Sequence, residues 1–129
     1  MSAISNYLEN ALLNATLRNT SYTSPTTVYA ALFTSDPTDA GTGTECTGTG
    51  YTRKAITFAA PSGGVTTNSA AACEFNQATG DWGTITHFGI FDALTTGNLL
   101  YYGALTIPKV ISSGDVFKFS TSSVSVTLA

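Results

Sequence analysis

Residues 82–105, WGTITHFGIFDALTTGNLLYYGAL, decide the fold class, because two apolar and aromatic runs flank a short turn. Both runs are rich in the β-branched and aromatic residues that pack well on a pleated sheet. The turn at residues 95–98 contains a glycine and an asparagine, which tolerate the positive φ of hairpin turns. The stretch therefore predicts one long β-hairpin. His87 and Asp92 are its only histidine and acidic residue, so we interpret it as a building element.

The chain around this hairpin consists of short apolar or alternating runs between Gly, Pro, Ser and Asn. Residues 27–33 are apolar on both faces, which is typical of a central strand. Pro108 must lie at an edge or a bend, because proline cannot donate to a sheet ladder. Residues 124–128 alternate with period two, which predicts a strand that ties the C-terminal end into a sheet. Residues 21–129 are thus expected to form a single mainly β domain, an antiparallel β-sandwich or barrel.

Residues 1–20 are expected to form an N-terminal helical arm. Residues 3–17 carry the helical periodicity of the chain, and Ser2 can cap the start of the helix. The apolar positions of this amphipathic helix fall on one stripe, which includes Ile4, Leu8 and Leu12. An isolated helix of this length is marginal in water, so the stripe must lie on a partner surface. That surface is either the sheet of the same chain or another subunit.

The composition favours a chain that packs against neighbours. The 129 residues suit one domain, and charged residues make up 10%, against roughly 25% in typical soluble domains. Few charges therefore oppose docking or self-association. The net charge of −3 and the absence of a basic stripe argue against nucleic-acid binding. No apolar run is long enough to span a bilayer and no signal peptide is evident, so no membrane partner is expected and the chain should be made and, at least at first, kept in a cytoplasm.

The residues available for metal binding are few. Cys46 and Cys73 are the two cysteines and His87 is the one histidine, which falls short of a zinc site. The cysteines leave two interpretations open. They are either reduced, partly buried thiols, or they form a disulfide after release from the cell, within one chain or between two.

The residues available for catalysis do not form a recognisable pattern. A Ser-His-Asp site would use His87 with Asp92 and a serine, but the chain has no Gly-x-Ser-x-Gly elbow. Asp36 and Asp39 flank a proline turn and are interpreted as backbone caps rather than calcium ligands. The glycine-threonine repeats at 41–44 and 48–50 lack the strand and helix of a phosphate-binding loop. We therefore expect neither an enzyme nor a cofactor.

Two further features are candidates for binding. Residues 40–50, which include Glu45 and Cys46, show no periodicity, and such a long loop is typical of a binding loop or a flexible arm. Trp82 stands beside Asp81 and Gly83, and an exposed tryptophan on a loop can contact glycans. It is the best glycan-contact candidate of the chain.

Residues 3–10, 27–34, 36–45 and 82–105 together resemble a widespread family of small virion structural proteins of tailed bacteriophages. Members are labelled tail-fibre-like, and the chain is also similar to capsid cement or decoration proteins. The resemblance spans nearly the whole chain and implies a structural role in the virion, without catalytic residues or cofactors. The family is not known to require cysteine, which leaves a covalent link between subunits open for this chain.

Three hypotheses follow. The first is a capsid decoration protein, a homotrimer that binds the major capsid protein. The second is a tail fibre, collar or baseplate subunit with a loop facing a host receptor or glycan, around Trp82 or residues 40–50. The third is a hydrolase of host glycan that uses His87 and Asp81. For the first two, the expected subunit or capsid contacts are Ile4, Leu8, Leu12, Glu45, Cys46 and Trp82.

Overall fold

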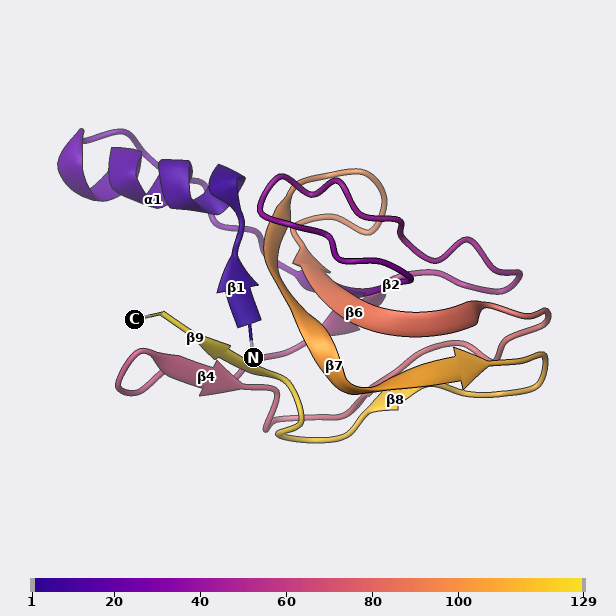
Figure 1. The fold of residues 1–129 in the computed structure, drawn as a ribbon. Helices are drawn as coiled ribbons and strands as arrows, with labels where there is room; N and C mark the ends of the chain where they lie inside the picture. Colours follow the sequence, from indigo (N-terminus) through magenta and orange to yellow (C-terminus); the bar gives the residue numbers. More distant parts are fainter. Residues whose placement is uncertain (1, 129) are drawn as a thin grey trace.

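The computed structural model describes residues 2–128 and is mainly β, with one helix near the N-terminus (Figure 1). Its elements in chain order are β1 (Ser2–Ile4), α1 (Asn6–Leu17), β2 (Val28–Phe33), β3 (Lys54–Ile56), β4 (Val65–Thr67), β5 (Cys73–Glu74), β6 (Gly83–Phe91), β7 (Leu99–Ile111), β8 (Lys118–Phe119) and β9 (Ser125–Thr127). A five-stranded antiparallel sheet has the order β1-β7-β6-β2-β3, and β4-β9 and β5-β8 form two-stranded sheets. The predicted fold class is confirmed, and the sheets do not close into a barrel.

The predicted hairpin is confirmed as β6 and β7, which pair at the middle of the large sheet. Its turn has positive φ at Thr96 (51°) and Gly97 (73°). Asn98, by contrast, contributes hydrogen bonds rather than a positive φ. Its backbone N–H and its side-chain amide donate to the Asp92 carboxylate at 2.7 and 3.0 Å. Asp92 therefore closes the turn.

The strand β7 is bent. Ala104 pairs with His87 and Lys109 pairs with Ile85, so five residue steps along β7 oppose two along β6. The extra residues bulge out of the ladder and include Pro108, which confirms the prediction that this proline lies at a bend. The distal half of β7, residues 105–111, begins with this bulge and continues at an angle to the first half of the strand (Figure 1).

The core occupies both faces of the sheet, and β2 is a central strand as predicted. The larger cluster surrounds Leu32, Ile85 and Ile90, and includes the aromatic side chains of Phe75, Trp82, Phe88 and Phe119. A smaller cluster on the other face contains Ala31, Phe33, Phe91 and Leu99. Both faces of β2 are therefore covered, which explains its continuous apolar sequence.

The N-terminal segment differs from the prediction. Residues 2–4 form β1, which pairs with β7, and Ser5 rather than Ser2 caps the helix by accepting a bond from the Leu8 N–H at 3.2 Å. Ile4 thus lies on a strand, and its assignment to the helical stripe is wrong. A tertiary contact explains this difference: the free edge of β7 pairs with residues 2–4, which would otherwise extend the helix. The boundary at residue 20 stays a prediction, although β1 belongs to the sheet of the β domain.

Among the described residues, no helix is both long and apolar enough to cross a membrane.

The C-terminal strand is confirmed as β9, which pairs with β4. Near this pair, Asn68 is fully buried. Its side-chain amide donates to the Ser120 carbonyl at 3.0 Å and its amide oxygen accepts from the Val124 N–H at 3.0 Å. One side chain therefore joins the end of β4 to the segment that leads into β9.

Replacing Asn68 with Ala should lower the free energy of unfolding by about 1–3 kcal/mol, because the Val124 N–H loses its buried partner and the Ser120 carbonyl loses one of its donors. The matched change Asn76→Ala, at an exposed asparagine, should stay within about 0.5 kcal/mol of the parent. Urea unfolding followed by tryptophan fluorescence measures both. Equal stabilities of the two variants would contradict the role assigned to Asn68.

Candidate functional site

The structure does not gather the predicted contact residues into one site. Ile4 and Leu12 are partly buried, and Leu8 is buried against the body of the chain. Glu45 and Cys46 lie beside β2, and Trp82 lies in the larger core cluster. The candidate contact features are instead three: the helical arm, the anchored loop at residues 40–50, and a groove beside β7.

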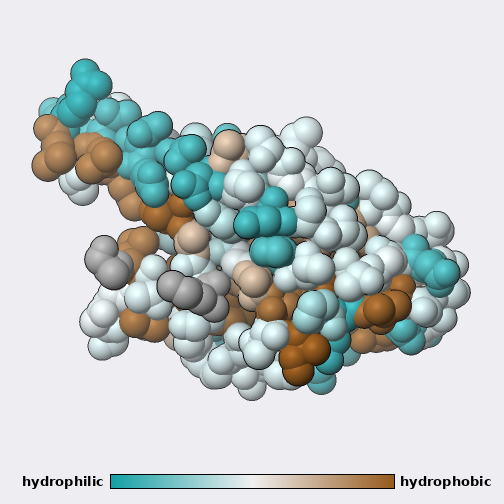
Figure 2. All heavy atoms as spheres, viewed as in Figure 1, coloured by the Kyte–Doolittle hydropathy of each residue, from teal (hydrophilic) through white to brown (hydrophobic). Residues whose placement is uncertain are grey.

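The helix α1 projects from the body of the protein (Figure 1). Leu8 in its first turn is its one buried residue, whereas Leu13 and Leu17 are 55% and 77% exposed. Figure 2 shows hydrophobic side chains along one side of this arm and hydrophilic ones along the other. The chain's own sheet thus covers the apolar stripe at Leu8, and the side that carries Leu13 and Leu17 is open.

The base of the arm is fixed to the body. The backbone N–H of Asn6 donates to the Asp39 carbonyl at 2.9 Å, and the Ser5 hydroxyl donates to the Leu99 carbonyl at 2.5 Å. The Tyr102 hydroxyl donates to the Asp39 carboxylate, and this hydrogen bond, more than burial, raises the pKa of Tyr102 to about 12. The phenol therefore stays protonated at neutral pH and keeps this contact.

The loop at residues 40–50 is anchored, so the expectation of a flexible arm is wrong. The Thr34 N–H donates to the Thr44 carbonyl at 2.9 Å, and the Cys46 N–H donates to the Leu32 carbonyl at 2.8 Å. These bonds extend the edge of β2. Gly48 also approaches the core closely, because a Cβ at this position would lie 2.2 Å from Cδ1 of Trp82.

The side chain of Glu45 is held inside the chain by Arg53. The guanidinium donates to both carboxylate oxygens, at 2.8 and 2.9 Å, and the Tyr51 hydroxyl donates to one of them at 2.6 Å. Burial, then the hydrogen bond to Glu45, raises the pKa of Tyr51, so its hydroxyl remains a donor. Glu45 therefore has a structural role that the sequence interpretation did not include.

Arg53 also binds the hairpin turn. Its Nη1 donates to the carbonyls of Ala93 and Thr96 at 2.9 and 2.7 Å, and its guanidinium carbon lies 3.7 Å from the ring centroid of Phe91. One buried cation thus joins the loop, the start of β3 and the β6–β7 turn. Sequence reasoning treated Arg53 only as part of the charge balance. The available signal was a cation that closely follows the glutamate of a loop, in a chain with so few charges.

Replacing Arg53 with Ala should lower the free energy of unfolding by about 2 kcal/mol, because a paired carboxylate and two carbonyls lose charged donors. The adjacent cation supplies the control, since Lys54→Ala at a partly exposed position should change stability by about 0.5 kcal/mol or less. Chemical denaturation of both variants is the measurement. A loss for Lys54→Ala as large as that for Arg53→Ala would show that Arg53 has no special role.

The glycan role predicted for Trp82 is wrong. Its side chain is 4% exposed and its ring meets Tyr51 edge to face at 5.5 Å. The indole N–H donates to the Thr49 carbonyl at 2.9 Å. The ring fills the space that Gly48 leaves open beneath the loop, and so it is available neither to a glycan nor to another subunit.

The two cysteines are buried free thiols, so the structure favours the reduced interpretation over a disulfide. The contact predicted for Cys46 is also wrong, because its side chain is not at the surface. Burial raises the pKa of both thiols, to about 11 for Cys73. The reactive thiolate is therefore scarce at neutral pH.

In the native protein, both thiols should resist a thiol-specific chromogenic reagent at mildly alkaline pH, because they are buried and protonated. Unfolding in guanidinium chloride should release two reactive thiols per chain. Absorbance measured before and after unfolding tests this. Rapid reaction of the native protein, or the absence of free thiols after unfolding, would be inconsistent with the structure.

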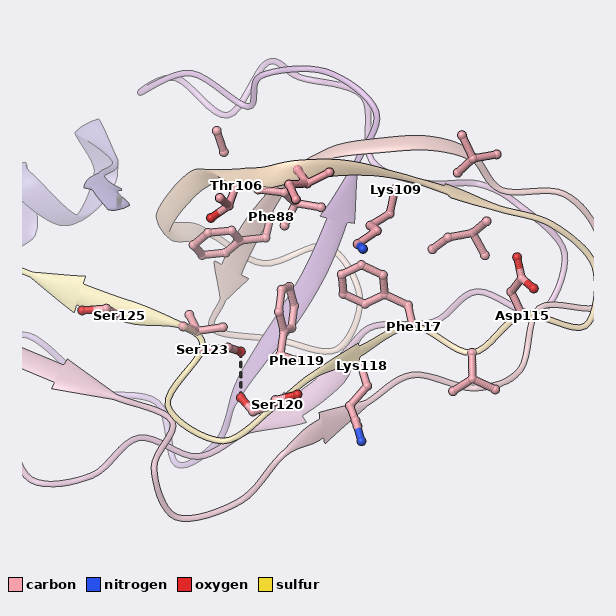
Figure 3. Close-up of a pocket in the computed structure, with 17 residues that line it drawn as sticks. Phe88, Thr106, Lys109, Asp115, Phe117, Lys118, Phe119, Ser120, Ser123 and Ser125 are labelled. Atoms are coloured by element: carbon pink, nitrogen blue, oxygen red, sulfur yellow. Dashed lines mark hydrogen bonds between the residues drawn. The ribbon is translucent and has the colours of Figure 1, made fainter.

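The groove lies between the distal half of β7 and residues 115–125, with a volume of about 680 Å³ (Figure 3). Phe88, Phe117 and Phe119 lie along it, and the ring of Phe119 meets the other two edge to face at 5.9 and 4.9 Å. Lys109, Lys118 and Asp115 are its charged lining residues. Sequence reasoning missed this groove, which depends on the bend in β7.

The titratable residues considered for catalysis have structural partners. His87 Nδ1 lies 2.8 Å from the Thr86 hydroxyl, and the Asp81 carboxylate accepts from the Ser113 N–H at 3.2 Å. The Asp36 carboxylate accepts from the Thr38 N–H at 2.9 Å, which confirms its role as a turn cap. Within residues 2–128, no three His, Cys, Asp or Glu side chains are grouped so that they could hold a metal ion.

Comparison with known families identifies the chain. A family model described as podophage GP4 fiber I protein gp80 matches residues 3–127, from β1 to β9. The chain belongs to the podophage GP4 fiber I protein gp80 family. Its membership in the gp80 fiber I family confirms the resemblance to phage structural proteins and the expected place of the chain in the virion. No curated protein matches the chain.

Proposed function

We propose that this protein is a structural subunit of a phage tail fibre, and that it works by packing against copies of itself. The single observation that carries the proposal is the match of nearly the whole chain to a phage fibre family. The projecting helix supports it, because its exposed leucines provide an apolar surface that a neighbouring subunit can cover. Burial of one leucine side chain contributes about 1.5–3 kcal/mol.

A homotrimer is part of this proposal. Each copy offers one arm at one side of its body, and identical copies related by rotation can each cover the arm of the next. The low charge of the chain supports such packing, since charged residues make up only 10% of it and little repulsion opposes contact.

The capsid decoration role and binding to the major capsid protein stay predictions, and the family description favours a fibre over them. Recognition of a host glycan is not part of the proposal, because Trp82 is buried and the loop at residues 40–50 is anchored. We also propose that the protein acts without catalysis. The hydrogen bonds that Asp81 and Asp92 make to backbone N–H groups support this, because both carboxylates serve turns.

Labelling of virions tests the proposed location. Gold-labelled antibodies raised against the purified protein should decorate the tail, and quantitative mass spectrometry should find far fewer copies than of the major capsid protein. The same serum, depleted with the purified protein, is the control. Labelling of the whole shell with hundreds of copies would overturn the fibre proposal in favour of capsid decoration.

A further inference from the structure

We propose that the exposed side of α1 docks into the groove between the distal half of β7 and residues 115–125 of a second copy of this chain. The inference rests on the proposed function, and it names the two surfaces through which fibre subunits join. Four observations support it: an uncovered helix, an uncovered groove, their separation on one molecule, and their charges.

The helix requires a cover. It is 12 residues long, and isolated helices shorter than roughly 12–15 residues are marginal in water. Its own body covers Leu8, while Leu13 and Leu17 extend along the open side. A stable arm therefore needs a second apolar surface over its last two turns.

The groove also requires a cover. Ile107, Val110 and Val116 line it and are 65%, 70% and 50% exposed. Figure 2 shows hydrophobic side chains over this bent part of β7. Clustered exposed apolar side chains beside a cavity are typical of an interaction surface. The buried rings of Phe88 and Phe119 give it an apolar floor, and its concave shape suits a projecting helix.

The arm and the groove lie on different sides of the same molecule. Figure 1 shows α1 extending from the body away from β8 and the distal half of β7, which border the groove. The helix therefore cannot cover the groove of its own chain. Each copy contributes one helix and one groove, so a head-to-tail arrangement of copies pairs every helix with a groove and closes into a ring when the rotation permits.

The charges of the two surfaces are complementary. The exposed end of the arm carries Arg18, and Asp115 is the acidic residue that lines the groove. The base of the arm carries Glu9, and Lys109 and Lys118 are the basic residues of the groove. An orientation that places Arg18 towards Asp115 places Glu9 towards the lysines, which favours one direction of docking.

Cysteine cross-linking of the full chain tests the inference. Differently tagged Leu13→Cys and Val110→Cys proteins are mixed and treated with a short bis-maleimide, and the native cysteines do not interfere because both are buried. Val65→Cys replaces Val110→Cys in the control, since Val65 is an exposed valine on β4 and does not line the groove. We expect the Leu13→Cys protein to cross-link to Val110→Cys with roughly ten times the yield that it gives with Val65→Cys. Burial of one aliphatic side chain is worth about a factor of ten in affinity, and the yield follows the fraction of chains that are docked.

A second pair of variants measures the interface without a reagent. Val110→Glu should weaken self-association by roughly tenfold or more, whereas Val65→Glu should leave it unchanged. Both side chains are exposed, so both variants should fold, which circular dichroism checks.

The outcomes separate the two proposals. If the parent protein self-associates but the Leu13→Cys protein cross-links equally to Val65→Cys and Val110→Cys, the docking inference is overturned and the fibre role stands. A protein that stays monomeric at every concentration overturns both the docking inference and the homotrimer of the proposed function, whereas the virion labelling still tests the location in the fibre. If antibodies label the capsid shell while Leu13→Cys still cross-links preferentially to Val110→Cys, the fibre role alone is overturned.

Discussion

The pairing of β7 with two partners is the constraint on which the rest of the structure depends. Its first half pairs with β6 on one edge and with β1 on the other, and this second pairing fixes where α1 begins. Its distal half, which includes the bulge with Pro108, borders the groove. One 13-residue strand thus sets the positions of both surfaces that we assign to assembly.

The network around Arg53 keeps this hairpin in place. The guanidinium joins the anchored loop through Glu45, and it joins the hairpin turn through the carbonyls of Ala93 and Thr96. Its hydrogen bonds are charge-assisted and partly buried, so they hold these segments more firmly than neutral bonds would. Arg53, a buried charged residue, is therefore used to position backbone.

Much of the fold was predictable from local pattern, and the errors occur where distant segments meet. The hairpin, the central strand β2 and the C-terminal strand follow from periodicity, since packing on a sheet selects alternating or continuous apolar residues. The start of α1 at Asn6 was not predictable, because it depends on the free edge of β7. Trp82 was misplaced for a similar reason: a tryptophan between Asp and Gly resembles a loop residue, and only Gly48 from another segment makes room for it.

The burial of both thiols has a consequence for the life of the particle outside the cell. Air and dissolved oxidants attack exposed thiolates, and many extracellular proteins counter such conditions with disulfides. Here Cys46 and Cys73 are buried free thiols. Close packing of side chains around the two thiols therefore limits the access of oxidants to them in aerated surroundings.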